Sequence, residues 1–220
     1  MVGDGETAEI AYEYFTSDSN YEIVAFSAEK SFIKKQALFG LPVIPFEEIE
    51  QFFDPKDHKA FVAISFTQLN RLRTRLFNIA KNKGYTLCSY LSPKAFIGKN
   101  VEIGENCFIF ENVTVQRSVK IGNNVTIWSG SFIGHRSVIG DNCFIASHVV
   151  ISGFCDVGEN CFFGVNSCIT DAKKIAKDCI IGAGAVVVKD ATKGMVYVGN
   201  PAKPLPGKNV DSFIKGKEMI

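Results

Sequence analysis

The chain has 220 residues, of which 46% are hydrophobic and 21% are charged, a composition typical of a globular protein long enough to bury a core. Its formal net charge of +1 and the lack of a long basic run argue against a nucleic-acid-binding surface, because neutralising phosphates requires clustered Lys and Arg. No apolar segment reaches the roughly 20 residues of a membrane span, and no signal peptide precedes the first predicted element, so we expect a cytoplasmic protein without membrane insertion.

Residues 1–92 alternate helical and strand-like patterns, which predicts a small parallel sheet covered by helices. The predicted elements, in chain order, are a helix over 6–15, a strand over 21–26, a short helix over 46–53, strands over 60–65 and 85–90, and between these two a helix over 67–84 that ends at Gly84. The basic run RLRTR at 71–75 falls in this last helix, opposite Leu72, Leu76 and Ile79. We interpret it as a solvated helix face.

The first turn, GDGETA at 3–8, matches the G-x-G-x-x-A pattern in which glycines let a phosphate approach a helix N-terminus. Gly3, Asp4 and Gly5 are therefore candidate nucleotide contacts. Only Met1 and Val2 precede the turn, so the strand that should lead into it is expected to be missing or truncated.

From Ile97 the sequence changes to a six-residue repeat that runs to residue 192, sixteen hexads without an insertion. The first position is Ile or Val in fifteen hexads, and the fifth is small or Val except at Lys173. This pattern predicts a β-solenoid, in which each coil buries its side chains by stacking on its neighbours. Seven cysteines occur without a CxxC motif, and five of them (107, 143, 155, 161 and 179) occupy the inward fifth position, as small core residues rather than metal ligands.

The fourth position of the hexad predicts the corners of the solenoid. It is Asn, Gly or Asp in eleven of sixteen hexads, the residues that best tolerate a positive φ. Residues 18 apart should stack on successive coils, and four of the five exceptions, Ser118, Arg136, Phe154 and Ala172, form one such column. The fifth exception, His148, stands at another corner. His135 lies on the irregular corner, with Gly153 above it and Arg117 below.

The sixth position points outward and distinguishes three faces. One face is mostly polar (102, 120, 138, 156, 174 and 192), and two are apolar: a second with residues 108, 126, 144, 162 and 180, and a third with 114, 132, 150, 168 and 186. Two adjacent exposed apolar faces predict an interface, and a cyclic trimer of parallel prisms would cover both. The His135 corner would then lie beside a neighbouring subunit.

The repeat resembles the left-handed parallel β-helix of hexapeptide-repeat acyltransferases. The whole chain is similar to bacterial sugar acetyltransferases that join a small nucleotide-sugar-binding domain to such a helix, most of all the UDP-amino-sugar N-acetyltransferases of the bacillosamine type. The residues that carry this resemblance are the hexads and the segments GVNSC at 164–168, GAGAVV at 182–187 and VGNPAK at 198–203. The resemblance implies an α/β domain over 1–92, a β-helix with a coenzyme A loop over 93–208, a tail over 209–220, and a homotrimer with active sites between subunits.

The resemblance also implies roles for named residues. Acetyl transfer from a thioester requires a base for the acceptor's proton and donors for the developing oxyanion. His135 matches the family's base, and Gly153 matches the glycine whose N–H meets the acetyl oxygen. The expected acetyl-CoA contacts are Phe144, Phe154, Asn166, Gly182, Ala183, Gly184, Asn200, Pro201, Ala202 and Lys203. Arg136, with Gly3, Asp4, Gly5 and Glu29, would contact the nucleotide sugar, and no metal is expected.

Two positions depart from the family pattern. Arg136 stands where the family commonly has an acidic residue after the base, and Phe144 replaces a second histidine. A backbone carbonyl or Asp171 could orient the His135 ring instead. The leading interpretation is an acetyl-CoA-dependent N-acetyltransferase acting on a nucleotide-linked amino sugar for surface-glycan synthesis. Sugar O-acetylation and a non-catalytic nucleotide-sugar-binding or scaffold protein remain alternatives.

Overall fold

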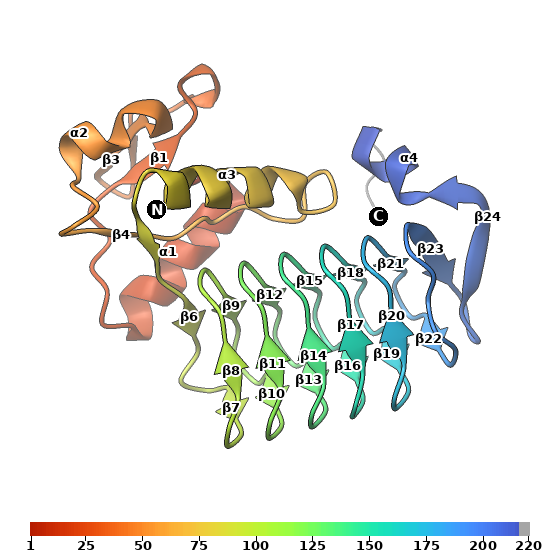
Figure 1. Cartoon of the computed structure of the whole chain (residues 1–220). Coiled ribbons are helices and arrows are strands. Elements are labelled where there is room, and N and C mark those ends of the chain that lie inside the picture. Colours follow the sequence, from red (N-terminus) through yellow and green to blue (C-terminus); the bar gives the residue numbers. More distant parts are fainter. Residues whose placement is uncertain (216–220) are drawn as a thin grey trace.

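The structure, a computed structural model, describes residues 1–215 and consists of an N-terminal α/β region that rests on one face of a three-sided β-helix (Figure 1). This is the predicted fold class. The predicted tail over 209–220 begins with a short helix, and its residues 216–220 lie outside the described part of the chain.

The N-terminal region contains short strands and three α-helices in a βα pattern. Its elements are α1 (Glu6–Asp18), β1 (Phe26–Ala28), the 3₁₀ turn η1 (Lys30–Phe32), β2 (Ala37–Leu38), β3 (Leu41–Pro45), the 3₁₀ turn η2 (Phe46–Glu48), α2 (Ile49–Phe52), β4 (Lys59–Ala60), α3 (Arg71–Asn82) and β5 (Thr86–Leu87). Strand β1 pairs in parallel with β3, β4 pairs in parallel with β5, and β2 adds an antiparallel edge.

The predicted truncated first strand is present as little more than one residue. Val2 forms parallel bridges to Ser27 and to Val62, and thus joins the β1 sheet to the segment after β4. The Val2 N–H donates to the Phe61 carbonyl, and the Val2 carbonyl accepts from Ala63, each at 2.8 Å. Val2 alone therefore takes the place of the missing first strand and connects the two neighbouring segments behind the GDGETA turn.

Several predicted boundaries in this region were wrong. The strands predicted over 60–65 and 85–90 are regular only at Lys59–Ala60 and Thr86–Leu87. Residues 21–25 are not strand, and β1 begins only at Phe26. The predicted helix over 67–84 starts at Arg71, because Gln68, Leu69 and Asn70 adopt φ values of 53°, 48° and 65°, a left-handed conformation incompatible with an α-helix. At the other end, Gly84 follows the helix with φ 91°, as predicted.

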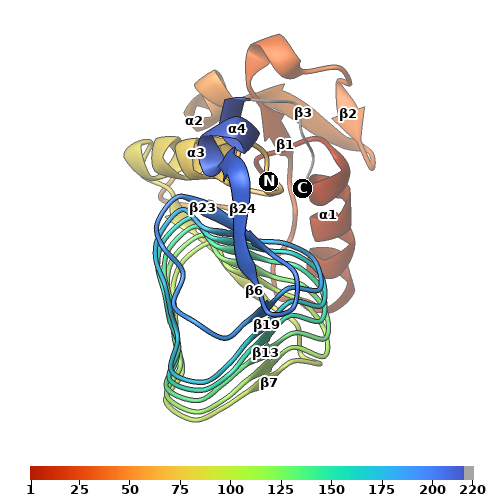
Figure 2. The ribbon, with the colours of Figure 1, turned by 90° about the vertical axis from the view of Figure 1, so that its right-hand side faces the viewer.

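The β-helix is built from three sheets, parallel apart from the last strand of the third, and their strands follow one another around each coil (Figure 2). The first sheet contains β7 (Phe96–Ile97), β10 (Thr114–Val115), β13 (Phe132–Ile133), β16 (Val150–Ile151), β19 (Cys168–Ile169) and β22 (Val186–Val187). The second contains β8 (Glu102–Ile103), β11 (Lys120–Ile121), β14 (Val138–Ile139), β17 (Asp156–Val157) and β20 (Lys174–Ile175). The third contains β6 (Tyr90–Leu91), β9 (Phe108–Ile109), β12 (Thr126–Ile127), β15 (Phe144–Ile145), β18 (Phe162–Phe163), β21 (Ile180–Ile181), β23 (Met195–Val198) and β24 (Lys203–Asn209).

The strand register confirms the prediction that residues 18 apart stack on successive coils. From β6 to β22, each strand pairs with the strand 18 residues away, as in Phe132 with Val150. The first and fifth positions of the hexads form a continuous buried core that contains the five repeat cysteines. Within residues 97–192, fifteen of the sixteen fourth positions have a positive φ, including 58° at both Arg136 and Phe154.

The three faces of the prism differ from the prediction in one respect. The face of the third sheet, which we call the covered face, is not free for another subunit, because the N-terminal region packs on it. Phe108 lies in a cluster with Phe15 and Phe61, and Phe66 packs against Phe144 and Phe162 with ring centroids 5.1 Å and 4.9 Å apart. The first sheet, the open face, exposes its apolar column, and the second, the charged face, is polar as predicted.

A C-terminal arm closes the covered face. Strand β24 folds back antiparallel to β23, and α4 (Val210–Lys215) follows it. Val210 shares one apolar cluster with Leu69 and Phe162. The arm therefore contacts both the last coils and the segment that precedes α3. In Figure 1, α4 lies above the C-terminal end of the β-helix.

Candidate active site

The corner between β13 and β14 carries His135, at the edge of the prism opposite the covered face. Gly134 precedes it, and Arg136 follows in the left-handed conformation that turns the chain. His135 is half-buried, whereas Arg136 is exposed. The irregular corner therefore presents an imidazole and a guanidinium side by side at the boundary of the open and charged faces.

The His135 ring is held by Gln116, one coil below. Gln116 Oε1 lies 3.0 Å from His135 Nδ1 and accepts the backbone N–H of His135 at 2.9 Å. A backbone carbonyl or Asp171 was the expected partner of the ring. Asp171 Oδ1 instead accepts the N–H of Gly153 at 3.0 Å.

Gln116 is a site residue that the sequence analysis missed. It occupies the second position of its hexad, which is Gly in half of the repeats, and there the only other polar residues are the short Ser152 and Thr170. A long polar side chain at a position that usually has none, 19 residues before the histidine, was the available signal.

Gly153 and Phe154 enclose the ring from the coil above. A Cβ on Gly153 would stand 2.7 Å from His135 Cε1, so only glycine lets the imidazole lie against this backbone. The Phe154 ring meets His135 edge-on at 4.9 Å, and the Arg136 guanidinium lies over Phe154 at 5.8 Å. The structure thus brings His135, Arg136, Gly153 and Phe154 together, as the column argument placed them.

A groove of about 540 Å³ opens beside His135 toward the first coil. Its lining residues are Phe96, Gly98, Lys99, Asn100, Gln116, Arg117 and His135. Lys99 and Arg117 form no ion pair within residues 1–215, so the groove offers two cations to an anionic group.

Most of the predicted acetyl-CoA contacts gather at the far edge of the open face, whereas Phe154 lies at the His135 corner. Gly182, Ala183 and Gly184 form a corner after β21, and the loop 199–203 lies against the adjoining strand β22, where the Ala202 N–H donates to the Val186 carbonyl at 2.8 Å. Ala183, Gly184 and Lys203 are exposed, and Asn166 is exposed one coil below.

The position of Phe144 argues against its predicted contact with acetyl-CoA. It lies on the covered face, is only 5% exposed, and stacks on Phe162 at 5.7 Å beneath Phe66. Its position is therefore that of a core residue between the two parts of the chain, and it is closed to a cofactor.

The predicted nucleotide contacts Gly3, Asp4 and Glu29 line a second hollow, a cleft of about 420 Å³ in the N-terminal region. It opens at the carboxyl ends of the Val2 bridge and of β1, beside the start of α1, which is the usual ligand position in a parallel sheet. Gly3 has φ 124°, and a Cβ there would stand 2.6 Å from the Ala63 carbonyl oxygen. Gly5 does not line the cleft. It is the N-cap of α1 and has no side-chain cap, so the first N–H groups of the helix lack a side-chain partner within residues 1–215.

Glu29 is not a free carboxylate in this cleft. Arg75 donates to both of its oxygens at 2.7 Å and 2.8 Å, and this pairing holds the pKa of the Glu29 carboxyl below its ordinary value. Arg75 thereby also lines the cleft.

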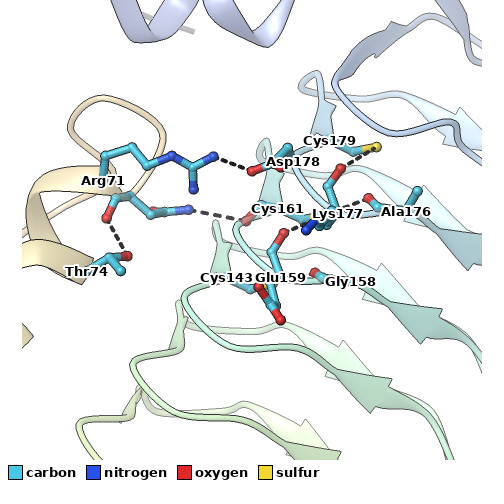
Figure 3. A network of polar contacts seen from close by, with 11 residues as sticks. Arg71, Thr74, Cys143, Gly158, Glu159, Cys161, Ala176, Lys177, Asp178 and Cys179 are labelled. Carbon is cyan, nitrogen blue, oxygen red and sulfur yellow. Dashed lines mark hydrogen bonds and ion pairs between the residues drawn. The ribbon is translucent and has the colours of Figure 1, made fainter. Parts of the chain in front are cut away.

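The prediction of a solvated run at 71–75 holds for Arg75, which is exposed, but is wrong for Arg73. Arg73 is 1% exposed, and its guanidinium donates to the carbonyls of Ser65, Asn124 and Cys143 at 3.1–3.2 Å. Arg71 pairs with Asp178 at a β-helix corner (Figure 3). These arginines fasten α3 to the solenoid.

Within residues 1–215, no helix is long and apolar enough to span a bilayer. In the same part of the chain, His, Cys, Asp and Glu side chains form no cluster of three that could hold a metal ion.

Comparison with known families and structures identifies the repeat. Residues 100–135 and 136–171 match the bacterial transferase hexapeptide family, and residues 156–189 match the hexapeptide repeat of succinyl-transferase. Residues 100–189 are therefore hexapeptide repeats of the transferase type, as the sequence resemblance predicted. No curated protein matches the chain.

Solved structures similar to the chain share both of its parts. PerB from Caulobacter crescentus, in complex with CoA and GDP-perosamine, is 27% identical, with a TM-score of 0.83 over 93% of this chain and 95% of that one. A histidine-to-asparagine mutant of perosamine N-acetyltransferase from the same organism is 26% identical, with a TM-score of 0.84 over 93% and 94% of the two chains. The acetyltransferase domain of PglB from Neisseria gonorrhoeae, at 24% identity and a TM-score of 0.82 over 93% and 97%, shares the fold.

Proposed function

We propose that this chain transfers the acetyl group of acetyl-CoA to the amine of a nucleotide-linked amino sugar, with His135 as the general base. One observation carries the proposal. His135 Nδ1 is engaged by Gln116, Nε2 has no hydrogen-bond partner within residues 1–215, and the residue lines an open groove. The neighbour PerB, which was solved with CoA and GDP-perosamine, supports the substrate class.

The chemistry requires one base and no covalent enzyme intermediate. The neutral amine nitrogen bonds to the acetyl carbon, the carbon–sulfur bond breaks, and sulfur leaves as the thiol of coenzyme A. His135 Nε2 takes the proton that the nitrogen loses and can return it to the departing sulfur. The Gly153 N–H is the proposed oxyanion donor, and the acetyl oxygen would replace Asp171 as its acceptor.

The chain's residues fit acetyl-CoA at the far edge of the open face. The backbone at Gly184 has open space where a Cβ would stand, which suits a pantetheine arm lying along the corner. Lys203, exposed on the adjoining loop, supplies a cation for a phosphate.

The nucleotide would occupy the N-terminal cleft. Its diphosphate would lie at the N-terminus of α1, because Arg75, the one cation lining the cleft among the described residues, is already engaged by Glu29. The sugar amine would extend toward a His135 groove.

The arrangement of these sites supports a homotrimer. In one chain the cleft belongs to the region on the covered face, whereas the His135 corner is the opposite edge of the prism. A neighbouring copy packed on the open face could bring its own cleft and acetyl-CoA edge to this corner. Active sites between subunits, and synthesis of surface glycans in the cytoplasm, remain part of the proposal.

The test is release of free thiol from acetyl-CoA across a matched panel of acceptors. The panel pairs GDP-, UDP- and dTDP-linked amino sugars with the same sugars carrying a hydroxyl in place of the amine. We expect thiol release and an acetylated product with at least one amino sugar and not with its hydroxyl partner. Release with the hydroxyl sugars alone would replace N-acetylation by O-acetylation, and no release with any acceptor would remove the enzymatic proposal.

A further inference from the structure

One side-chain oxygen decides which nitrogen of His135 carries the proton. Gln116 Oε1 accepts the backbone N–H of His135 at 2.9 Å, and the same oxygen lies 3.0 Å from Nδ1 of the ring. A glutamine side chain presents both an acceptor and a donor, so its orientation must be established before the ring can be assigned.

The backbone fixes that orientation. The His135 N–H can only donate, so the atom that meets it must be the oxygen of the amide and not its NH₂. The oxygen is purely an acceptor, and a neutral ring must therefore turn its N–H toward it. Nδ1 is protonated, and the lone pair stands on Nε2.

We infer that Gln116 is a positioning residue that holds His135 in the Nδ1-protonated tautomer and so keeps Nε2 ready to accept a proton. It takes the part that a carboxylate would play, without a charge. Its effect on catalysis rests on the proposed function, whereas its effect on the tautomer does not.

The surroundings of the ring leave this role to Gln116. Gly153 and Phe154 contact it through backbone and through an aromatic edge. The charged groups facing the site are Lys99 and Arg117 from the coils below, Arg136 beside the ring, and Asp171, which is engaged by the Gly153 N–H. Within residues 1–215, no other side chain hydrogen-bonds a ring nitrogen of His135.

The first measurement is the ring ¹⁵N NMR spectrum of ligand-free, histidine-labelled protein at a pH where the ring is neutral. The chain has three histidines, and a His135→Asn sample assigns the signal. We expect Nδ1 to show the shift of a protonated nitrogen and Nε2 that of an unprotonated one. In Gln116→Ala both shifts should move toward those of a tautomer mixture, whereas Gln116→Glu, which keeps the acceptor, should retain the wild-type pattern.

The control is Asn123→Ala. Asn123 Oδ1 accepts the Glu105 N–H at 2.9 Å, so this variant removes a similar bond between coils at a different corner. Its His135 spectrum should equal the wild type. A protonated Nε2 in the wild type, or a Gln116→Ala spectrum unchanged from it, would overturn the assignment.

Kinetics supply the second readout. Gln116→Ala should lower kcat roughly tenfold or more with KM within about threefold, because fewer molecules hold the base in the correct tautomer. Gln116→Glu should restore most of kcat and move the acid limb of the pH profile to higher pH, since a carboxylate stabilises the protonated imidazole. A wild-type kcat in Gln116→Ala would contradict the positioning role. A fixed tautomer in a protein with no acetyl transfer would instead refute only the proposed function.

Discussion

Among single residues, those that replace Asn or Gly at one corner of the β-helix mark the position of the candidate site. They are Ser118, Arg136, Phe154 and Ala172. Asn tolerates a positive φ better than Phe or Arg, yet Phe154 and Arg136 both adopt φ 58°. Phe154 is 52% exposed and meets the His135 ring edge-on, so its unfavourable backbone conformation accompanies a contact with the proposed base rather than a place in the core.

Replacing Phe154 by Asn should leave the free energy of unfolding unchanged or raise it by up to ~1 kcal/mol, because Asn accepts the left-handed conformation more readily. It should also lower kcat/KM about tenfold by loosening His135. Thermal melts and steady-state kinetics measure both effects. Lower stability with normal kinetics would show that Phe154 is only packing.

The matched variant is Asn142→Phe, at a corner that turns the chain without a proposed catalytic role. Asn142 has φ 63°, and its Oδ1 accepts a hydrogen bond from Asn124 at 2.8 Å. We expect a loss of ~2 kcal/mol of stability with little direct effect on the site. A Phe at 142 that the fold tolerates as well as Asn would undermine the argument from corner residues.

At the scale of elements, α3 is fastened to the β-helix by a buried arginine. Arg73 has carbonyl oxygens, and no carboxylate, as hydrogen-bond partners, and burial lowers its pKa to about 10. Within residues 1–215, removing it would leave the Ser65 and Asn124 carbonyls without a donor, whereas the Cys143 carbonyl would keep the Thr126 N–H. The helix therefore owes part of its position to polar contacts that its amphipathic pattern did not reveal.

Arg73→Ala should lower the free energy of unfolding by ~3 kcal/mol, because it creates a cavity and unpaired carbonyls. Arg71→Ala, which removes the partly exposed pair with Asp178, should cost ~1 kcal/mol or less. Urea denaturation of both variants provides the comparison. Equal losses would mean that burial does not distinguish the two arginines.

These elements also show what the sequence could predict. The β-helix, its register and its corners follow from an uninterrupted period of six, because one hexad fixes the geometry of the next. The packing of residues 1–92 has no such period. The burial of Arg73, the left-handed turn at Gln68–Asn70 and the covering of Phe144 all depend on contacts between segments far apart in the chain. Gln116 lay within the repeat, but its role emerged only when the distance to His135 was known.

At the scale of the whole molecule, the open face is the remaining apolar surface of the prism. The covered face is occupied by the chain's own N-terminal region and C-terminal arm, so Phe144 and Phe162 are not available to another copy. Phe132 and Val150, paired across β13 and β16, point outward on the open face. Exposed apolar columns of this kind mark an interface.

The double variant Phe132→Asp, Val150→Asp should dissociate the proposed trimer into folded monomers, because it would place six buried charges at the interfaces of each trimer. Phe144→Asp should instead unfold the chain, since it places a charge in a buried cluster. Light scattering and circular dichroism distinguish the two. A wild-type chain that is monomeric at micromolar concentration would contradict the trimer.

The most direct test of the central claim compares wild type with His135→Asn in acetyl transfer to the best nucleotide-linked amino sugar of the panel, with the product identified by mass spectrometry. We predict a loss in kcat of about 100-fold or more, with the assembly state and coenzyme A affinity nearly unchanged, as removal of a general base requires. Turnover within threefold of the wild type would show that His135 is not the base and that the corner is not the catalytic centre.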